Sequence, residues 1–239
     1  MTRTRAYHSM SKRPPRNKGV PCVRIIAGRW RSRRLSVPGP ATTRPMTDRV
    51  KEAVFSVLGS HYGSPGRLPA LAVADLFAGS GSLGLEAVSR GAARCRFFES
   101  DAEALKVLRG NLVALNAGPE LSVVELDAWH DSLDPPVTGS EYDLTFVDPP
   151  YRDARDVSPS GQMHALFERC IRERLWAADA VAVVHHQAGV TYPESFASGS
   201  RVVERKRYGR TAVTFFGLSG SAARPGGDGN RRDGVDPGR

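Results

Sequence analysis

The chain has 239 residues, and 40% of them are hydrophobic, which is enough to build the core of a single domain. No apolar run reaches the ~18–20 residues of a membrane-spanning helix, and the N-terminus lacks an apolar signal-peptide core, so we expect a cytoplasmic protein without a membrane partner. The three cysteines have neither metal-ligand spacing nor an obvious pairing, which argues against a disulfide or zinc framework.

The net charge of +9 comes entirely from the N-terminal part of the chain. Residues 1–47 contain twelve Lys and Arg and no Asp or Glu, whereas the remainder contains 22 basic and 25 acidic residues. Localised positive charge is typical of a protein that binds a polyanion, although a basic tail without a partner would look the same. Residues 1–19 and 219–239 have almost no apolar side chains, so both are predicted to be disordered tails.

Residues 20–41 are predicted to form an arginine-rich β-hairpin. Two short β-prone runs flank Gly28-Arg29, and Pro38-Gly39-Pro40 ends the segment. Arginines beside an exposed Trp30 would suit phosphate contact and base stacking. The alternative is a hairpin edge that arginine merely keeps soluble.

The remaining chain alternates strands with helices. The first predicted helix begins after Thr47, which is a suitable N-cap, and ends at Gly59. Strands are predicted over 71–77, 94–98, 121–126, 142–147, 180–185, 201–207 and 211–217, and helices over 83–90, 102–116 and about 161–176. This alternation predicts a mostly parallel, doubly wound sheet covered on both faces, and the last two strands predict an antiparallel edge.

A glycine-rich turn follows the first of these strands. Gly79, Gly81 and Gly84 stand between an apolar run and a helical pattern, and Glu99 comes twenty positions after the first of them. Glycine lets the backbone approach a ligand, and the start of a helix offers unpaired N–H groups. This context favours a nucleotide-type cofactor site over a plain glycine turn, at the carboxyl ends of the strands.

The segment Asp148-Pro149-Pro150-Tyr151 ends the fourth strand of this series. Two prolines prevent the strand from continuing and fix a rigid turn. The Asp148 carboxylate and the Pro149 carbonyl would hold the two N–H groups of an exocyclic base amine, and the Tyr151 ring would stack on the base. A purely structural Pro-Pro turn is the alternative.

These residues carry a family resemblance. Asp148-Pro-Pro-Tyr151 resembles the D/N-P-P-Y/F/W motif of S-adenosylmethionine-dependent amino-methyltransferases, and Asp75-Leu-Phe-Ala-Gly-Ser-Gly81 is similar to their cofactor motif. With these, Arg24-Ile-Ile-Ala-Gly-Arg-Trp-Arg-Ser-Arg-Arg-Leu35, Arg44-Pro-Met-Thr-Asp-Arg-Val-Lys-Glu-Ala-Val-Phe55 and Gly79-Ser-Gly-Ser-Leu-Gly-Leu-Glu-Ala87 resemble the bacterial 16S rRNA guanine-N2 methyltransferases of the RsmD type, over about residues 23–217.

The resemblance implies a Rossmann-like class I methyltransferase fold over residues 42–218, with seven strands and a small N-terminal hairpin extension. It implies methyl transfer from S-adenosylmethionine to the N2 amine of one guanine in 16S rRNA, either free or in the small ribosomal subunit. We expect a monomer.

The resemblance also implies roles for individual residues. Glu99 would bind the ribose hydroxyls, and Asp127 with Ala128 would contact adenine. The full cofactor set is Thr47, Asp75, Phe77, Ala78, Gly79, Ser80, Gly81, Gly84, Glu99, Ser100, Asp127 and Ala128. The catalytic set is Asp148, Pro149, Pro150 and Tyr151, and the RNA set is Arg24, Arg29, Trp30, Arg31, Arg33, Arg34, Arg44 and Arg49.

Three places in the sequence depart from the family pattern. Met46 stands where a threonine is usual, His185-His186-Gln187 replaces a commonly acidic strand end, and Arg210 follows Tyr208-Gly209 where an acidic residue is common. Adjacent histidines on a strand point to opposite faces, so they cannot chelate one ion alone, and we predict no metal site.

Three other functions fit part of the pattern. A DNA adenine or cytosine amino-methyltransferase would use the same Asp-Pro-Pro-Tyr chemistry, but no segment after Tyr151 is large enough for a separate target-recognition domain. An NAD-dependent oxidoreductase fits the glycine turn and Glu99, yet explains neither that motif nor the arginines. In a catalytically silent RNA-binding protein, replacing Asp148 by Ala would leave no activity to lose.

Overall fold

The computed structural model describes residues 23–39, 46–135, 140–197 and 199–218. The predicted disordered tails and Arg44 lie outside these ranges. None of the helices in the described ranges combines the length and the hydropathy that a membrane span requires.

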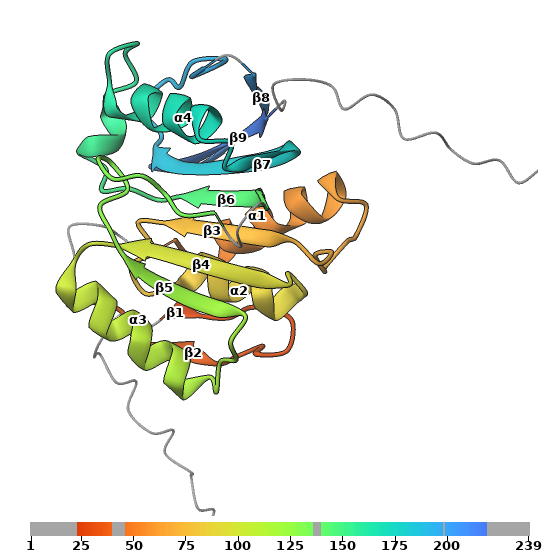
Figure 1. Ribbon diagram of the computed structural model, residues 1–239. Coiled ribbons are helices and arrows are strands. Elements are labelled where there is room, and N and C mark those ends of the chain that lie inside the picture. Colours follow the sequence, from red (N-terminus) through yellow and green to blue (C-terminus); the bar gives the residue numbers. More distant parts are fainter. Residues whose placement is uncertain (1–22, 40–45, 136–139, 198, 219–239) are drawn as a thin grey trace, which may run out of the picture.

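Seven strands form the central sheet, in the order β5-β4-β3-β6-β7-β9-β8 (Figure 1). β9 is antiparallel to both of its neighbours, β7 and β8, and the pairings among the five strands from β5 to β7 are all parallel. The predicted seven-stranded, mostly parallel sheet with an antiparallel edge is therefore confirmed. The strands are β3 (Ala72–Leu76), β4 (Arg94–Glu99), β5 (Leu121–Glu125), β6 (Tyr142–Val147), β7 (Trp176–Gln187), β8 (Ser200–Tyr208) and β9 (Thr211–Leu218).

The order of the strands reverses between β3 and β6. From β3 the chain continues outward to β4 and β5, and from β6 it continues the other way to β7. The arrowheads of β3, β4 and β6 point to the same side of the molecule in Figure 1. Ligands of open α/β sheets bind at the carboxyl ends of the strands beside such a reversal.

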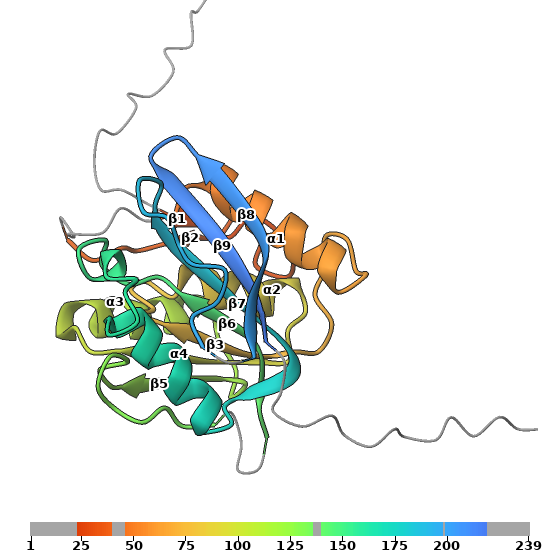
Figure 2. The same ribbon diagram turned by 90° about the horizontal axis from the view of Figure 1, so that it is seen from above.

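Helices cover both faces of this sheet. α1 (Asp48–His61), α2 (Ser82–Arg90) and α3 (Ala102–Ala114) share one hydrophobic cluster with the sheet, and α4 (Gln162–Arg172) shares the other. Val73 and Ala74, neighbours on β3, belong to opposite clusters because successive strand side chains alternate between faces. Figure 2 shows α1 and α4 on opposite sides of the sheet.

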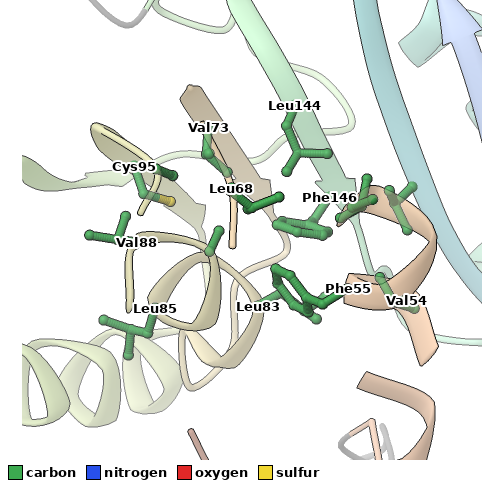
Figure 3. Packing of buried hydrophobic residues seen from close by; sticks show 14 of the residues in the cluster. Val54, Phe55, Leu68, Val73, Leu83, Leu85, Val88, Cys95, Leu144 and Phe146 are labelled. Atoms are coloured by element: carbon green, nitrogen blue, oxygen red, sulfur yellow. The ribbon is translucent and has the colours of Figure 1, made fainter. Parts of the chain in front are cut away.

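The first cluster lies between α1, α2 and the sheet. Phe55 of α1 faces Phe146 of β6, with ring centroids 5.7 Å apart, and Leu83 and Val88 of α2 fill the same layer (Figure 3). These side chains are all 5% exposed or less, so α1 is anchored over the strands whose ends carry the candidate site.

Two predicted boundaries differ from the structure. α1 continues through Gly59 to His61. A Cβ at Gly59 would stand 3.1 Å from the Ser64 carbonyl oxygen. The glycine therefore allows close packing of the following loop rather than ending the helix. α4 ends at Arg172, and Trp176 already belongs to β7, where its indole donates to Thr145 on β6. The short 3₁₀ helix η1 (Asp153–Arg155) was not predicted.

An N-terminal hairpin is present as predicted, but its strands are short, and residues 20–22, 40 and 41 of the predicted range lie outside the described residues. β1 (Val23–Arg24) and β2 (Arg34–Leu35) pair antiparallel over two residues each. The connecting loop is held instead by α2: the Glu86 carboxylate accepts hydrogen bonds from the Ile26 and Ala27 N–H groups at 2.7 and 3.0 Å. The hairpin is therefore an anchored part of the domain.

Glu86 is the centre of a buried ion cluster that also contains Lys51 of α1 and Arg90 of α2. Its carboxylate lies 3.4 Å from Lys51 Nζ and 2.7 Å from Arg90 Nε, and all three side chains are almost inaccessible. Lys51 Nζ also donates to the Arg24 carbonyl at 2.7 Å and to Ser82 Oγ at 3.0 Å. Burial lowers the pKa of Lys51, and the charge of Glu86 opposes that shift.

Candidate active site

The glycine loop between β3 and α2 has the open backbone that a ligand site requires. Phe77, Gly79 and Gly81 have φ values of 59°, 56° and 78°, in the left-handed region. A Cβ at Gly79 would meet only the Phe77 carbonyl oxygen, at 4.0 Å, whereas one at Gly84 would lie 2.5 Å from side chains of β4. Gly79 thus leaves room for a ligand, and Gly84 allows α2 to pack on the sheet.

Asp75, near the end of β3, is hydrogen-bonded to the start of α2 just after this loop. Its side chain is buried, and Oδ2 accepts a hydrogen bond from the Gly84 N–H at 2.8 Å. Burial raises the pKa of the Asp75 carboxyl well above its ordinary value, the Gly84 hydrogen bond opposes the shift, and the charges of Asp148 and Glu99 add to it. The switch point therefore gathers three carboxyl groups, from β3, β4 and β6.

Glu99 lies beside the same loop, at the end of β4. Its Oε2 accepts from the Gly79 N–H at 2.8 Å, and its Oε1 accepts from the Ser100 and Asp101 N–H groups, each at 2.8 Å. These bonds fix the carboxylate in place. A carboxylate offers about four lone-pair directions, so capacity for a ligand hydroxyl remains.

The turn after β5 places an aromatic ring near the loop. Phe77 and Trp129 have ring centroids 4.6 Å apart. The Asp127 carboxylate accepts from the Trp129 N–H at 2.9 Å and contacts His130 Nδ1 at 2.7 Å, and Ala128 is buried beneath the turn. Burial acts to raise the pKa of Asp127, but these hydrogen bonds outweigh it, so the pKa is lowered. Trp129 was missed by sequence reasoning, although an aromatic residue just after a strand-end Asp is a usable signal.

The proline-containing turn follows β6 directly. The Asp148 N–H donates to the Leu76 carbonyl at 3.3 Å, so the turn begins beside the end of β3. The Pro150 carbonyl accepts from the Asp153 and Ala154 N–H groups at 2.9 and 3.1 Å, which starts η1. The two strand ends at the switch point therefore bring the glycine loop and Asp148 together.

The Asp148 side chain is held by His185 of β7. Asp148 Oδ1 and His185 Nδ1 are 2.7 Å apart, and the Asp148 side chain is 25% exposed while that of His185 is 2% exposed. Tyr151 Oη lies 3.3 Å from His185 Nε2 and 2.6 Å from Thr211 Oγ1. Although burial acts in the opposite direction, the charge and hydrogen bond of Asp148 raise the pKa of His185.

The neighbouring histidine belongs to the other face of the sheet. His186 Nε2 lies 2.9 Å from Thr214 Oγ1, and its ring stacks on Tyr192 with centroids 3.9 Å apart. Burial lowers its pKa to about 4. The prediction that the two histidines point to opposite faces is confirmed by these separate partners.

A cleft of about 490 Å³ opens on the Tyr151 side of this network. The start of α1, the turn after β6, the end of β7 and the β8–β9 turn form its walls, with Thr47, Tyr151, Arg155, His185 and Arg210 among the lining residues. Polar, aromatic and cationic groups thus line one cavity next to Asp148. Thr47 caps α1, accepting from the Val50 N–H at 3.4 Å, and lies in this cleft rather than at the glycine loop.

Comparison with known proteins identifies the family. The family model described as "Conserved hypothetical protein 95" matches residues 23–217. YlbH of Bacillus subtilis, whose name gives it provisionally as an rRNA methyltransferase, is 31% identical over 195 residues, which cover 81% of this chain and 98% of the relative. The Ribosomal RNA small subunit methyltransferase D of Escherichia coli is 41% identical over 138 residues, 58% of this chain and 65% of the relative.

This chain belongs to the RsmD-type rRNA methyltransferase family. A solved structure agrees: the yhhF protein of Escherichia coli, named provisionally as a methyltransferase, is 32% identical with a TM-score of 0.64 over 84% of this chain and all of that one. The Rossmann-like methyltransferase fold is confirmed.

The family match of this RsmD-type protein includes the N-terminal hairpin, whose arginines differ in their surroundings. Arg24 contacts Asp48 at 2.6 Å, Arg29 pairs with Glu120, and Arg33 donates to a carbonyl at the end of α3. All the same, these three side chains are exposed. They are tied to the domain and still offer charge to solvent.

Arg31, Arg34 and Arg49 are also exposed, and within the described ranges none of them forms an ion pair with a carboxylate. Trp30 was expected to be exposed, but it is half-buried and packs against the core, with the Arg29 guanidinium 4.0 Å from its ring centroid. Because the loop is anchored to the domain, the Trp30 side chain can pack against the core. The hairpin pattern in the sequence does not reveal this packing.

Proposed function

We propose that this RsmD-type protein transfers a methyl group from S-adenosylmethionine to the exocyclic N2 amine of a guanine in 16S rRNA. S-adenosylmethionine supplies a methyl group on a positively charged sulfur. The observation that carries the proposal is the meeting of the glycine loop with Asp148 at the switch point, because a carboxylate there would hold an amine close to a cofactor bound on the glycine loop.

The electrostatics of the site favour a cationic cofactor. The negative charge comes from Glu99 and Asp148, which lie close enough to raise the pKa of the buried Asp75 further. Such a concentration of negative charge attracts a cation and repels the pyrophosphate of a nicotinamide dinucleotide. S-adenosylmethionine carries positive charge and no phosphate, so the site suits it better than NAD.

The residues of the glycine loop side would hold the cofactor. Glu99 keeps acceptor capacity for the ribose hydroxyls, the opening above Gly79 leaves room for the methionine part, and Phe77 with Trp129 provides an apolar surface for adenine. Asp127 would accept from the adenine amine.

The target base would enter the cleft beside Tyr151. An exocyclic amine is a poor nucleophile because its lone pair is conjugated with the ring, so its orientation contributes much of the rate. Asp148 would accept one N–H of the amine and the Pro149 carbonyl the other, while Tyr151 would stack on the base turned out of the RNA. Arg155 and Arg210 at the cleft would contact the neighbouring phosphates.

The test is transfer of labelled methyl from S-adenosylmethionine to four substrates: free 16S rRNA, small ribosomal subunits, 23S rRNA and duplex DNA. We expect label in the first or second, and digestion to nucleosides should give N2-methylguanosine. Label in DNA alone would favour the adenine or cytosine amino-methyltransferase and overturn the proposal. Calorimetry with NADH in place of the cofactor should give no binding.

A further inference from the structure

His185 has no role in the function proposed above, yet it contacts the residue on which that function depends. It lies at the end of β7, between the turn after β6 and β9, and its side chain is 2% exposed. Burying a polar side chain costs free energy, and an apolar side chain would fill the same space without that cost. A buried histidine in contact with a partly exposed carboxylate beside a cleft is therefore a candidate for a functional role.

The geometry around His185 selects one tautomer. The ionised Asp148 carboxylate can only accept, so the 2.7 Å contact requires the proton on Nδ1. On the other side of the ring, Nε2 lies 3.3 Å from Tyr151 Oη and 3.3 Å from Thr211 Oγ1, and these two hydroxyl oxygens are 2.6 Å apart. Either hydroxyl group can donate to Nε2 while the other donates to that hydroxyl, so the ring is restrained at both nitrogens.

This restraint gives the two oxygens of the Asp148 carboxylate different roles. Its Oδ1 is committed to His185, and its Oδ2 has no hydrogen-bond partner among the described residues. The carboxylate cannot rotate without breaking the short bond to a ring that is itself fixed. One oxygen is therefore held in a constant direction and remains able to accept a hydrogen bond from a ligand.

We propose that His185 is a positioning residue for the methyl transfer: it fixes the orientation of the Asp148 carboxylate, with Tyr151 and Thr211 locking the imidazole. The inference rests on the proposed function and extends it to a residue that replaces the acidic strand end expected from the family resemblance. An acidic side chain there would repel Asp148, whereas the histidine offers it an N–H donor.

The protonation state of His185 should then change the rate of methyl transfer. The groups that face its ring are Asp148 after β6, Tyr151 in the following turn and Thr211 on β9, while Arg155 and Arg210 line the same cleft and His186 is its neighbour on β7. The amine nitrogen gains positive charge as its bond to the methyl carbon forms and the carbon–sulfur bond breaks; the cofactor leaves as the neutral thioether S-adenosylhomocysteine, and the nitrogen then loses a proton to water. A protonated His185 weakens the negative field of Asp148 at that nitrogen, so turnover should rise as His185 loses its proton.

The experiment compares three variants with the wild type. His185→Asn keeps an N–H near the position of Nδ1 but does not titrate, His185→Leu removes the donor, and His61→Gln changes an exposed histidine at the far end of α1. The readouts are kcat and KM for RNA over pH 5.5–9, calorimetric affinity for S-adenosylhomocysteine, and the melting temperature.

We expect His185→Leu to lower kcat by about 10- to 100-fold with little change in cofactor affinity, because misplacement of a reacting group has costs of this order. His185→Asn should recover most of that loss and should lack the inflection of kcat with pH that the wild type and His61→Gln retain. An unchanged kcat in His185→Leu, or an inflection that survives in His185→Asn, would overturn the proposal.

A measurement without turnover keeps the two proposals separate. NMR titration of the His185 ring should give a higher pKa in the wild type than in Asp148→Asn, and this applies equally if His185→Leu does not fold. If the two titrations coincide, the inference fails while the methyltransferase proposal stands. If the titrations differ but no RNA accepts a methyl group, the proposed function fails and the pairing remains.

Discussion

The buried ion cluster of Lys51, Glu86 and Arg90 and the Asp148–His185 pair are both built around a carboxylate, but they differ in access. Every side chain of the buried ion cluster is almost inaccessible, and Glu86 is fully occupied by two cations and two backbone N–H groups. Asp148 is 25% exposed, and its second oxygen has no hydrogen-bond partner among the described residues.

This difference separates a structural carboxylate from a candidate catalytic one. A saturated carboxylate has no capacity left for a substrate, so its contribution is to dock the hairpin on α1 and α2. A half-satisfied carboxylate at a strand end is ready to accept a hydrogen bond from a ligand. Substitutions at the two sites should therefore affect different measurements, stability at the first and turnover at the second.

The largest effect is expected at Asp148. Asp148→Ala should lower methyl transfer by at least ~100-fold while largely sparing cofactor affinity, because the proposed partner of the carboxylate is the target amine. Label incorporation and calorimetry measure the two quantities. Asp179→Ala, which removes an exposed carboxylate of β7, is the matched control. Full turnover in Asp148→Ala would remove this residue from the mechanism.

The second effect concerns Glu86, the carboxylate of the buried ion cluster. Glu86→Gln replaces an oxygen by an NH₂ group that would face N–H donors, and it leaves two buried cations without a counter-charge. Breaking a buried ion pair costs about 3–5 kcal/mol, so the free energy of unfolding should fall by about that amount. Urea denaturation measures it, with the exposed Glu52→Gln on α1 as control. Equal stability of the two variants would contradict the structural role assigned to Glu86.

A smaller effect is expected from the hairpin that the buried ion cluster docks. Arg31 and Arg34 are exposed and unpaired with carboxylates of the described ranges, so they are the arginines most available to phosphate. Changing both to Gln should reduce the slope of log K against log salt for RNA binding by about 2, at unchanged stability. Filter binding at several salt concentrations measures the slope. An unaltered slope would return the hairpin arginines to a solubility role.

The smallest effect is a pH dependence of stability from His185. Its pKa is raised above the ordinary value of 6.5, so its contribution is fully present below that pH and is lost as the pH rises through the pKa of the folded state. The stability advantage of the wild type over His185→Asn should therefore shrink as the pH is raised from 6 to above that folded-state pKa. Denaturation curves at several pH values test this, and an advantage that grows with pH would contradict the pairing.

Local sequence patterns were sufficient for the architecture. Alternating apolar runs and helical spacing predicted the seven strands and the antiparallel edge, because these periodicities come from the backbone geometry of strands and helices. The glycines at 79, 81 and 84 and the two prolines at 149 and 150 predicted the candidate site for the same reason, since each restricts or frees the backbone at its own position.

Only the tertiary structure decided which side chains these elements bring together. The Asp148–His185 contact joins residues 37 apart, and the Ile26–Glu86 contact joins residues 60 apart. A sequence pattern states which face a residue occupies, whereas a contact between distant elements depends on strand order, register and the packing of helices on the sheet. For that reason His185 looked like a departure from the family pattern, and the fold made it the partner of Asp148.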